Sequence, residues 1–314
     1  MVERASAQGA PCAAERTLLV DGLPIAFLER LPGTAAGRTP PPVVFLHGFT
    51  GSGRSWTGVW EHFEGLGFDR VLYAPDIIGH GRTGAPSSPE RYAIQAAAND
   101  LAVLLDLLGA PLVDLVGYSM GGRLALYFAA SYPGRVRRLV LESATAGIED
   151  PREREERRAR DNELAGWIEA HGIEAFVDRW ESLPLFASQA NLPPGVREAQ
   201  RKARLANLPR GLANSLRGMG TGAQPPLWEK LGGVRAECLV IAGAKDEKFS
   251  AIARRMHELL PGSRLAVAPG AGHNVHLEAP AFFAEAVVAF LSSGVTGRLR
   301  SAGGQGAGEN PASA

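Results

Sequence analysis

The sequence has few cysteines, no long apolar run and no excess of either charge, and each absence narrows the class of protein. Among its 314 residues only Cys12 and Cys238 are cysteines, which argues against a disulfide framework and suits a reducing cytoplasm. No segment has the pattern of a signal peptide or the length and apolarity of a membrane-spanning helix. Lys and Arg total 33, as do Asp and Glu, so general electrostatic binding to nucleic acid or to an anionic membrane is not expected.

Apolar residues make up 45% of the chain and fall into short runs separated by helical patterns. Buried short strands that alternate with helices are typical of a mostly parallel sheet. Residues 17–20 and 25–29, joined by a turn that contains Asp21-Gly22, predict an antiparallel hairpin before it. We therefore expect an α/β fold with an eight-stranded, mostly parallel sheet flanked by helices. The predicted parallel strands are residues 43–46, 71–74, 112–116, 138–141, 238–242 and 265–268.

Residues 145–226 interrupt this alternation, because they carry helical patterns and no evident strand. An insertion between two strands of the core is expected to cover the carboxyl ends of the strands, where ligands bind in open α/β sheets. The expected organisation is a disordered N-terminus (1–16), a core in two parts (17–144 and 227–293), a helical cap insertion (145–226) and a disordered tail (294–314).

Residues 117–121 read Gly-Tyr-Ser-Met-Gly and fall between a predicted strand and a predicted helix. This is the G-x-S-x-G pattern in the context that a nucleophile elbow requires. The glycines let strand and helix approach closely, and the turn exposes the Ser119 hydroxyl at a helix N-terminus, where backbone N–H groups favour negative charge. A chance match is the alternative, since the chain has 38 glycines. The flanking strand and helix favour the elbow, and with it an α/β-hydrolase fold.

A second motif, residues 46–51, reads Leu-His-Gly-Phe-Thr-Gly and directly follows the predicted strand 43–46. In this fold, the loop at that place gives one N–H of the oxyanion hole, and the residue after the nucleophile gives the other. These residues are Phe49 and Met120. A plain glycine turn is the alternative interpretation of residues 46–51.

The acid and the base of a triad are expected to follow the serine in the order Ser, Asp, His. Asp246 and His273 each follow a predicted strand, so both are expected at the same edge of the sheet as Ser119. His273 would take the serine proton, and Asp246 would orient the imidazole and stabilise its cation.

Four other residues are candidates for the same roles. Asp76 and His80 precede the serine in the chain, and His80 is expected to shape its loop. His276 lacks the flanking glycines of His273, and Asp114 lies within a predicted strand. The order of the chain and the strand-end positions favour Asp246 and His273 over these four.

The two motifs, taken together with the insertion, resemble one family closely. That family is 2-succinyl-6-hydroxy-2,4-cyclohexadiene-1-carboxylate synthase of menaquinone biosynthesis, and the resemblance covers residues 17–292. The elbow is shared with many hydrolases, whereas the insertion segments are more specific. The segments that carry the resemblance are residues 46–53, 117–123, 176–181, 183–186, 216–222 and 224–228.

The resemblance implies a carbon–oxygen lyase rather than a hydrolase. In this family pyruvate is eliminated from 2-succinyl-5-enolpyruvyl-6-hydroxy-3-cyclohexene-1-carboxylate. The activated carbonyl is a ketone, so no ester leaving group can be expelled, and the Ser119–His273 pair would act as the base. The Phe49 and Met120 amides would hold the enolate oxygen. No metal or cofactor is implied, and no cluster of metal ligands is apparent.

The resemblance also implies substrate-binding residues, since this small-molecule substrate carries three carboxylates. They are Arg123, Arg157 and Arg204, with Tyr118 and Trp180 as further contacts. Arginine suits the role because its planar fork binds a carboxylate bidentately. For Arg157 a solvated helix face with i,i+4 ion pairs is a strong alternative, and Trp180 could equally be a core aromatic of the insertion.

Two other functions remain open at this point. The same triad could hydrolyse esters, lactones or vinylogous carbon–carbon bonds, or the chain could be a binding protein on a hydrolase scaffold. The intact Ser, Asp and His argue against a mere binding protein. No nucleic-acid or membrane partner is expected. The sequence does not give the oligomeric state, and a monomer is favoured.

Overall fold

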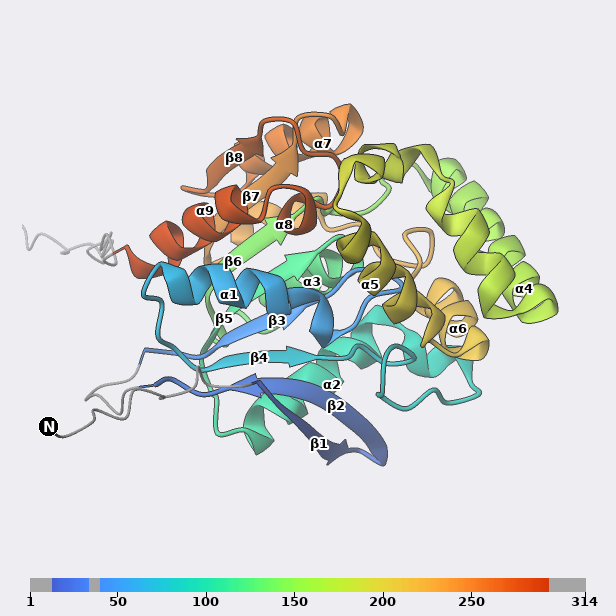
Figure 1. Cartoon of the computed structure of the whole chain (residues 1–314), viewed down its shortest axis with the longest axis horizontal. Helices are drawn as coiled ribbons and strands as arrows, with labels where there is room; N and C mark the ends of the chain where they lie inside the picture. The colour runs from blue at the N-terminus through green and yellow to red at the C-terminus, as the bar shows by residue number, and fades with distance from the viewer. Residues whose placement is uncertain (1–12, 34–39, 294–314) are drawn as a thin grey trace, which may run out of the picture.

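The computed structural model describes residues 13–33 and 40–293, which form one mixed sheet in the order β1-β2-β4-β3-β5-β6-β7-β8 (Figure 1). The pairs β1–β2 and β2–β4 are antiparallel, and all later pairs are parallel. The expected eight-stranded α/β fold is therefore confirmed. The strands are β1 (Ala14–Val20), β2 (Leu23–Arg30), β3 (Val43–Leu46), β4 (Leu72–Pro75), β5 (Val113–Tyr118), β6 (Val136–Glu142), β7 (Glu237–Gly243) and β8 (Arg264–Ala268).

Strand β1 begins earlier than the sequence predicts, at Ala14 instead of residue 17. The last residues of the segment predicted to be disordered are therefore strand. Glu15 and Arg16 are charged, but Ala14 pairs with Glu29 in the hairpin and Arg16 forms an ion pair with Glu29 at 3.1 Å. The other parts of the chain predicted to be disordered, and Cys12, lie outside the described residues.

Helices cover both faces of the sheet, and this is why the central strands β3, β4 and β5 are buried along their whole length. One face packs against α1 (Thr57–Gly65) and α9 (Pro280–Ser292), with the short α8 (Val275–Glu278) beside them. The other face packs against α2 (Ile94–Leu107), α3 (Met120–Ser131) and α7 (Glu247–Leu259). Short 3₁₀ turns complete the core: η1 (Gly53–Trp56), η2 (Pro89–Tyr92) and η4 (Trp228–Gly233).

Between β6 and β7 the chain forms a layer of helices that we call the cap. It consists of α4 (Pro151–Glu181), η3 (Pro184–Asn191), α5 (Pro194–Leu205) and α6 (Pro209–Met219). Figure 1 shows these helices beyond the carboxyl ends of the parallel strands. Apolar side chains of α4 and α6, among them Ile168, Phe176 and Leu212, form a small core of their own. In the described ranges, no helix is long and apolar enough to cross a lipid bilayer.

Helix α4 contains a kink that the sequence analysis did not predict. At Gly172 the backbone has φ +79° and ψ −179°, which is not helical. This region is essentially restricted to glycine, because a Cβ would be strained there. A Cβ on Gly172 would meet no heavy atom within 4 Å, so the requirement for glycine is one of backbone conformation and not of space.

The kink predicts opposite effects for alanine at two glycines of α4. Gly172→Ala is expected to lower the free energy of unfolding by about 1–3 kcal/mol through backbone strain. Gly166→Ala in the same helix, where a Cβ also meets nothing within 4 Å, is expected to raise it by about 0.5–1 kcal/mol through helix propensity. Urea unfolding of both variants measures the difference. A Gly172→Ala variant as stable as the wild type would contradict the strained backbone.

Candidate active site

Ser119 lies in the turn between β5 and α3 and has φ +49°, a left-handed conformation that serine rarely adopts. Its amide donates to the Glu142 carbonyl, at the end of the neighbouring strand β6, at 2.8 Å. A Cβ on Gly121 would lie 2.1 Å from the Leu46 carbonyl oxygen, and one on Gly117 would lie 2.5 Å from the Gly121 carbonyl oxygen. Only glycine fits at these two positions, so the sequence pattern has its physical reason in this close packing.

The structure brings Ser119, His273 and Asp246 together from three different loops. The Ser119 hydroxyl lies 3.2 Å from His273 Nε2, and His273 Nδ1 lies 2.6 Å from Asp246 Oδ2. A neutral His273 therefore carries its proton on Nδ1, donates it to Asp246, and accepts the serine proton at Nε2. The Phe249 amide donates to Asp246 Oδ1 at 3.1 Å, which fixes the carboxylate. His273 and Asp246 are buried, whereas Ser119 is half-buried.

The turn that carries His273 is held by Glu278, a residue that the sequence analysis did not single out. The Glu278 carboxylate accepts from the Gly272 amide at 2.7 Å and from the Asn274 amide at 3.2 Å, one residue on each side of His273. The cap also reaches this turn, because a Cβ on Gly272 would lie 2.1 Å from Ser188 Oγ of η3. No local pattern in the sequence marks this role of Glu278, because it depends on how the turn packs.

Residues 47–51, which we call the oxyanion loop, are anchored by a buried neutral histidine. His47 Nε2 accepts from the Ile77 amide at 2.9 Å, so Nδ1 carries the proton and donates to the Gly48 carbonyl at 2.8 Å. Burial lowers the pKa of His47 to about 4, which keeps this tautomer in place at neutral pH. The Tyr118 ring covers Gly48, where a Cβ would lie 2.6 Å from the ring.

Both residues predicted to donate to an oxyanion are next in the chain to a residue close to the serine or to the serine itself. Phe49 follows Gly48, on which a Cβ would lie 3.6 Å from the Ser119 Cβ. Met120 is the first residue of α3, so its N–H belongs to the first turn, where no carbonyl of the same helix can accept it. The Phe49 ring packs against the cap residues Phe176 and Trp180.

Asp76 and His80 form hydrogen bonds with the backbone of their own region. The Asp76 carboxylate accepts from the Gly53 amide at 2.7 Å and from the Arg82 amide at 2.8 Å, so it ties the loop after β3 to the loop after β4. His80 Nδ1 lies 3.2 Å from the Ile78 carbonyl, and burial lowers the pKa of His80 to about 3. In neither case is a triad residue the partner.

His276 and Asp114 are also bound to other partners. The Glu142 carboxylate accepts from the His276 amide at 2.9 Å and lies 2.7 Å from His276 Nδ1, so Glu142 holds this turn as well as the Ser119 amide. Asp114 lies near the start of β5, at the opposite end from the elbow, and binds Arg70 and Arg137 at 2.7 and 2.6 Å. Neither residue replaces the triad members named from the sequence.

Arg123 is a buried cation one helical turn after Ser119. Its Nη1 donates to the Met219 carbonyl at 2.8 Å and to Gln224 Oε1 at 2.9 Å, and both partners are neutral. Burial, reinforced by repulsion from Arg157, lowers the pKa of Arg123 to about 10. Arg157 donates to Asp161 at 2.8 Å, so the single negative charge of Asp161 lies near the two positive charges of Arg123 and Arg157. This end of the cap interface therefore has an excess of positive charge.

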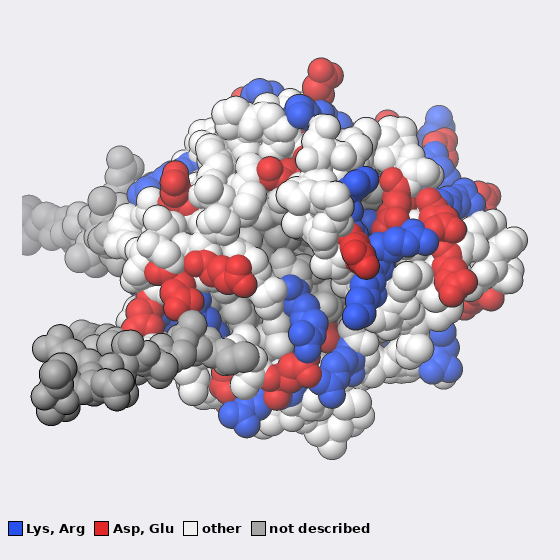
Figure 2. Space-filling model, viewed as in Figure 1, with Lys and Arg blue, Asp and Glu red and all other residues white. Residues whose placement is uncertain are grey.

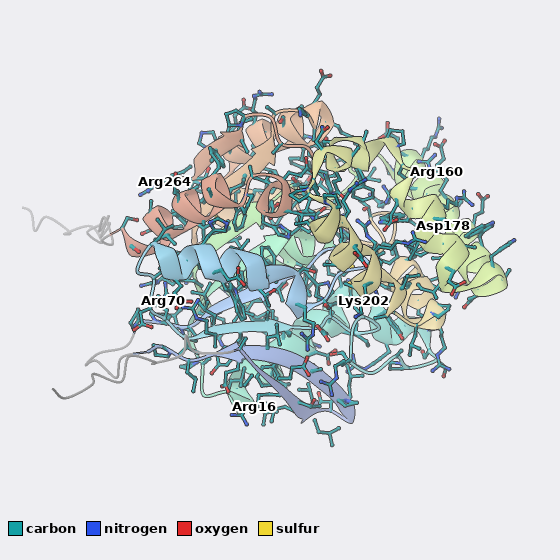
Figure 3. All side chains as sticks on the ribbon, in the orientation of Figure 1. Arg16, Arg70, Arg160, Asp178, Lys202 and Arg264 are labelled. Carbon is teal, nitrogen blue, oxygen red and sulfur yellow. The ribbon has the colours of Figure 1, made fainter. Side chains whose placement is uncertain are left out.

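A solvated helix face with ion pairs describes the neighbours of Arg157 better than it describes Arg157 itself. Arg158 and Arg160 form ion pairs with Glu155 and Glu156 on the outside of α4, and the side chain of Arg160 is 63% exposed. Arg157 is less exposed, at 38%. Figure 2 shows positive and negative side chains interleaved over the cap, and Figure 3 shows Arg160 on its outer side.

Arg204 lies at the other side of the cap interface, near His273. It is buried, donates to Glu181 at 2.9 Å and lies over the Phe186 ring at 5.4 Å. The Phe186 ring is in turn 6.5 Å from the His273 ring. Arg204 is also close enough to Tyr118 to oppose the raised pKa that burial gives this phenol.

Trp180 packs with Phe49, Phe176 and Phe186, so it is a core aromatic of the cap interface. Its indole N–H is nevertheless buried and has no acceptor among the described residues. The same is true of the Nε2 of Gln224, which the sequence analysis quoted only for the resemblance. The described residues hold other buried donors without acceptors, among them the Trp56 and Trp60 indoles of the core, so this feature is not specific to the cap.

Comparison with known proteins agrees with this architecture. The α/β hydrolase fold family matches residues 41–280. The putative 2-succinyl-6-hydroxy-2,4-cyclohexadiene-1-carboxylate synthase of Bacillus subtilis is 46% identical over 87% of this chain and 96% of its own length. The chain belongs to this synthase family. The family expected from the sequence is therefore confirmed, and with it the expectation that the protein is a lyase.

Two further members support the assignment to the synthase family. The 2-succinyl-6-hydroxy-2,4-cyclohexadiene-1-carboxylate synthase of Salmonella agona is 31% identical over 84% of this chain and 97% of its own length. The solved structure of MenH from S. aureus has a TM-score of 0.78 and 34% identity, covering 84% of this chain and 97% of that one. Within the described residues, no group of three or more His, Cys, Asp or Glu side chains is arranged to hold a metal ion.

The buried histidines predict that acid destabilises the fold. The unfolded chain protonates His47 and His80 near pH 6.5, whereas the folded protein keeps them neutral to about pH 4 and 3. The unfolded state thus binds more protons below pH 6.5, and the free energy of unfolding should fall by up to about 1.4 kcal/mol per pH unit for each histidine. Urea unfolding between pH 7 and 5 measures the slope.

His47→Asn should make this slope shallower, because one of the two proton sites is removed. His62→Gln, a change at an exposed histidine of α1, should leave the slope as it is. Identical slopes for wild type and His47→Asn would contradict the neutral state of His47.

Proposed function

We propose that the protein is a carbon–oxygen lyase that eliminates pyruvate from 2-succinyl-5-enolpyruvyl-6-hydroxy-3-cyclohexene-1-carboxylate. The ring product would be 2-succinyl-6-hydroxy-2,4-cyclohexadiene-1-carboxylate, in menaquinone biosynthesis. Membership of the synthase family supports the reaction. The observation that best supports this site for the reaction is Arg123. It is a buried cation one turn from Ser119, and its hydrogen-bond partners are neutral groups. Such a cation is expensive to bury unless an anion joins it.

The proposed reaction is a 1,4-elimination. The ring proton next to the succinyl ketone leaves, and its electron pair forms an enolate conjugated with the ring double bond. That double bond then shifts by one position, and the carbon–oxygen bond to the enolpyruvyl group breaks. The leaving group takes up a proton to become pyruvate, so the reaction is neither an oxidation nor a hydrolysis.

Ser119, His273 and Asp246 would supply the base for this elimination. The Ser119 hydroxyl passes its proton to His273 Nε2 as it takes the ring proton, and Asp246 stabilises the imidazolium that forms. The contact of 3.2 Å between Ser119 and His273 is at the long end of a hydrogen bond, as is common before a substrate binds. Because the activated carbonyl is a ketone, no acyl-enzyme would form.

The Phe49 and Met120 amides would stabilise the enolate oxygen. Fixed N–H donors in a site shielded from water are worth more than donors in solution, since they need no reorganisation as charge develops. The cap supplies the shielding here through Phe176 and Trp180, which pack against the oxyanion loop. Tyr118 covers the same loop from the core.

The three substrate carboxylates would be bound by arginines from two sides. Arg123 and Arg157 form a group near Asp161, which is the one carboxylate bonded to either of them in the described part of the chain, and Arg204 lies on the side of His273. Trp180 and Gln224 would add hydrogen-bond donors, since both have buried N–H groups without acceptors in the described structure.

Incubation of the purified protein with the enolpyruvyl substrate should release pyruvate, followed with lactate dehydrogenase. Ser119→Ala should lower kcat by about 10²–10⁴-fold, the usual contribution of a positioned base, while the protein keeps its melting temperature. A wild type that gives a fast burst with p-nitrophenyl esters and no pyruvate would instead identify a serine hydrolase.

Substitution of the cap arginines should separate substrate contacts from surface charge. Arg157→Ala is expected to lower kcat/KM for pyruvate release by about 10–100-fold, the loss of one charge-assisted contact. Arg160→Ala, three residues further along α4 and exposed, removes the same charge and should change kcat/KM by less than about twofold. Equal effects of the two changes would mean that Arg157 acts only through the general field of the cap.

A further inference from the structure

Asn207, which directly follows the last turn of α5, joins the cap to the oxyanion loop. Its side-chain NH₂ donates to the Thr50 carbonyl at 2.9 Å, and its Oδ1 accepts from the Gly81 amide at 3.0 Å. The same NH₂ lies 3.1 Å from the Arg204 carbonyl and 3.3 Å from the Ala203 carbonyl, at the end of α5. Asn207 is only 3% exposed, so these bonds are shielded from water.

The hydrogen bond from Asn207 to Thr50 is linked to the proposed oxyanion donor, the Phe49 N–H, by one further hydrogen bond. The Thr50 carbonyl shares a peptide plane with the Gly51 N–H, which donates to the Gly48 carbonyl at 3.0 Å. Thr50 has φ +69°, as the third residue of a type II turn requires. The Gly48 carbonyl shares a peptide plane with the Phe49 N–H, and in a planar trans peptide the two point in opposite directions. Holding the Thr50 carbonyl therefore sets the direction of the Phe49 N–H.

We propose that Asn207 is a positioning residue through which the docked cap aims the Phe49 N–H at the reacting oxygen. The helix that would present Arg204 to the substrate and the loop that would present the Phe49 amide are held by one side chain. Anion binding under the cap and oxyanion stabilisation on the core are thereby coupled. This inference rests on the proposed function in so far as the Phe49 amide is an oxyanion donor.

Asn214 provides a matched control for the alternative that Asn207 only fastens the cap. It lies on α6 and is 2% exposed, and its NH₂ donates to the Pro86 and Ser87 carbonyls at 3.2 and 3.1 Å. Like Asn207, it is a buried asparagine that joins a cap helix to backbone carbonyls of the core. Unlike Asn207, it has no contact with the oxyanion loop among these bonds.

The test compares Asn207→Ala, Asn207→Asp and Asn214→Ala by two reactions. Asn207→Asp keeps the acceptor for the Gly81 amide and places an oxygen where the donor to Thr50 was. The first reaction is pyruvate release, measured as kcat and KM. The second is labelling of Ser119 by a neutral alkyl fluorophosphonate. In this step the Ser119 Oγ–P bond forms, the P–F bond breaks, fluoride leaves, and the serine proton passes to His273.

The phosphonyl oxygen needs the oxyanion donors but no arginine, so the two reactions separate the loop from the anion site. Both Asn207 variants should lower kcat and the labelling rate by about 10–100-fold, as misplaced oxyanion donors do, with KM within about threefold of wild type. Asn214→Ala should lower the melting temperature and leave both rates within about twofold, like other contacts away from the reacting atoms.

Two results would overturn the proposal. One is a raised KM with unchanged kcat and labelling in the Asn207 variants, which would mean that Asn207 only holds Arg204. The other is an equal loss of both rates in Asn214→Ala. If the wild type releases no pyruvate, the lyase function fails, and the labelling rates alone decide the role of Asn207.

Discussion

The hydrogen bond from the Ser119 amide to the Glu142 carbonyl holds the turn on which the rest of the site depends. Without such support, a serine with φ +49° would relax, since strain of this kind costs about 1–3 kcal/mol. The close approach of Gly121 to the Leu46 carbonyl adds a second constraint, because β3, β5 and α3 leave no space for the turn to move. The Ser119 hydroxyl consequently faces His273, and the Met120 N–H at the start of α3 stays beside it.

The charged arginines of the site lie at the boundary between the core and the cap. The whole chain is neutral, so it would attract the proposed anionic substrate only weakly over long distances, and recognition would be local. Arg123 and Arg204 are buried there, where little water screens them and where binding of the proposed substrate carboxylates would offset the cost of their desolvation. Arg204 is held by Glu181, whereas Arg123 is held by neutral groups, so the two sides of the site present unequal charge.

The parts of the structure that the sequence predicted are those with local signals. Strand patterns, the glycines around Ser119 and the order of Ser119, Asp246 and His273 along the chain were sufficient for the sheet and for the three residues that the structure brings together. The contacts of Glu278 and Asn207 could not be predicted, because each depends on hydrogen bonds whose partners are set by tertiary packing. The kink in α4 was not predicted for another reason: the residue pattern around a glycine is the same in a bent helix as in a straight one.

Glu142 contributes to the distance between Ser119 and His273. Its carbonyl binds the Ser119 amide at the end of β5, while its carboxylate binds the turn at His276 that follows His273. Ser119 and the turn after His273 are thus both tied to the ends of two adjacent strands, β5 and β6, and neighbouring strands in a sheet are about 4.8 Å apart. The separation of Ser119 and His273 therefore depends on the pairing of two core strands as well as on the loops that carry Asp246, His273 and Glu278.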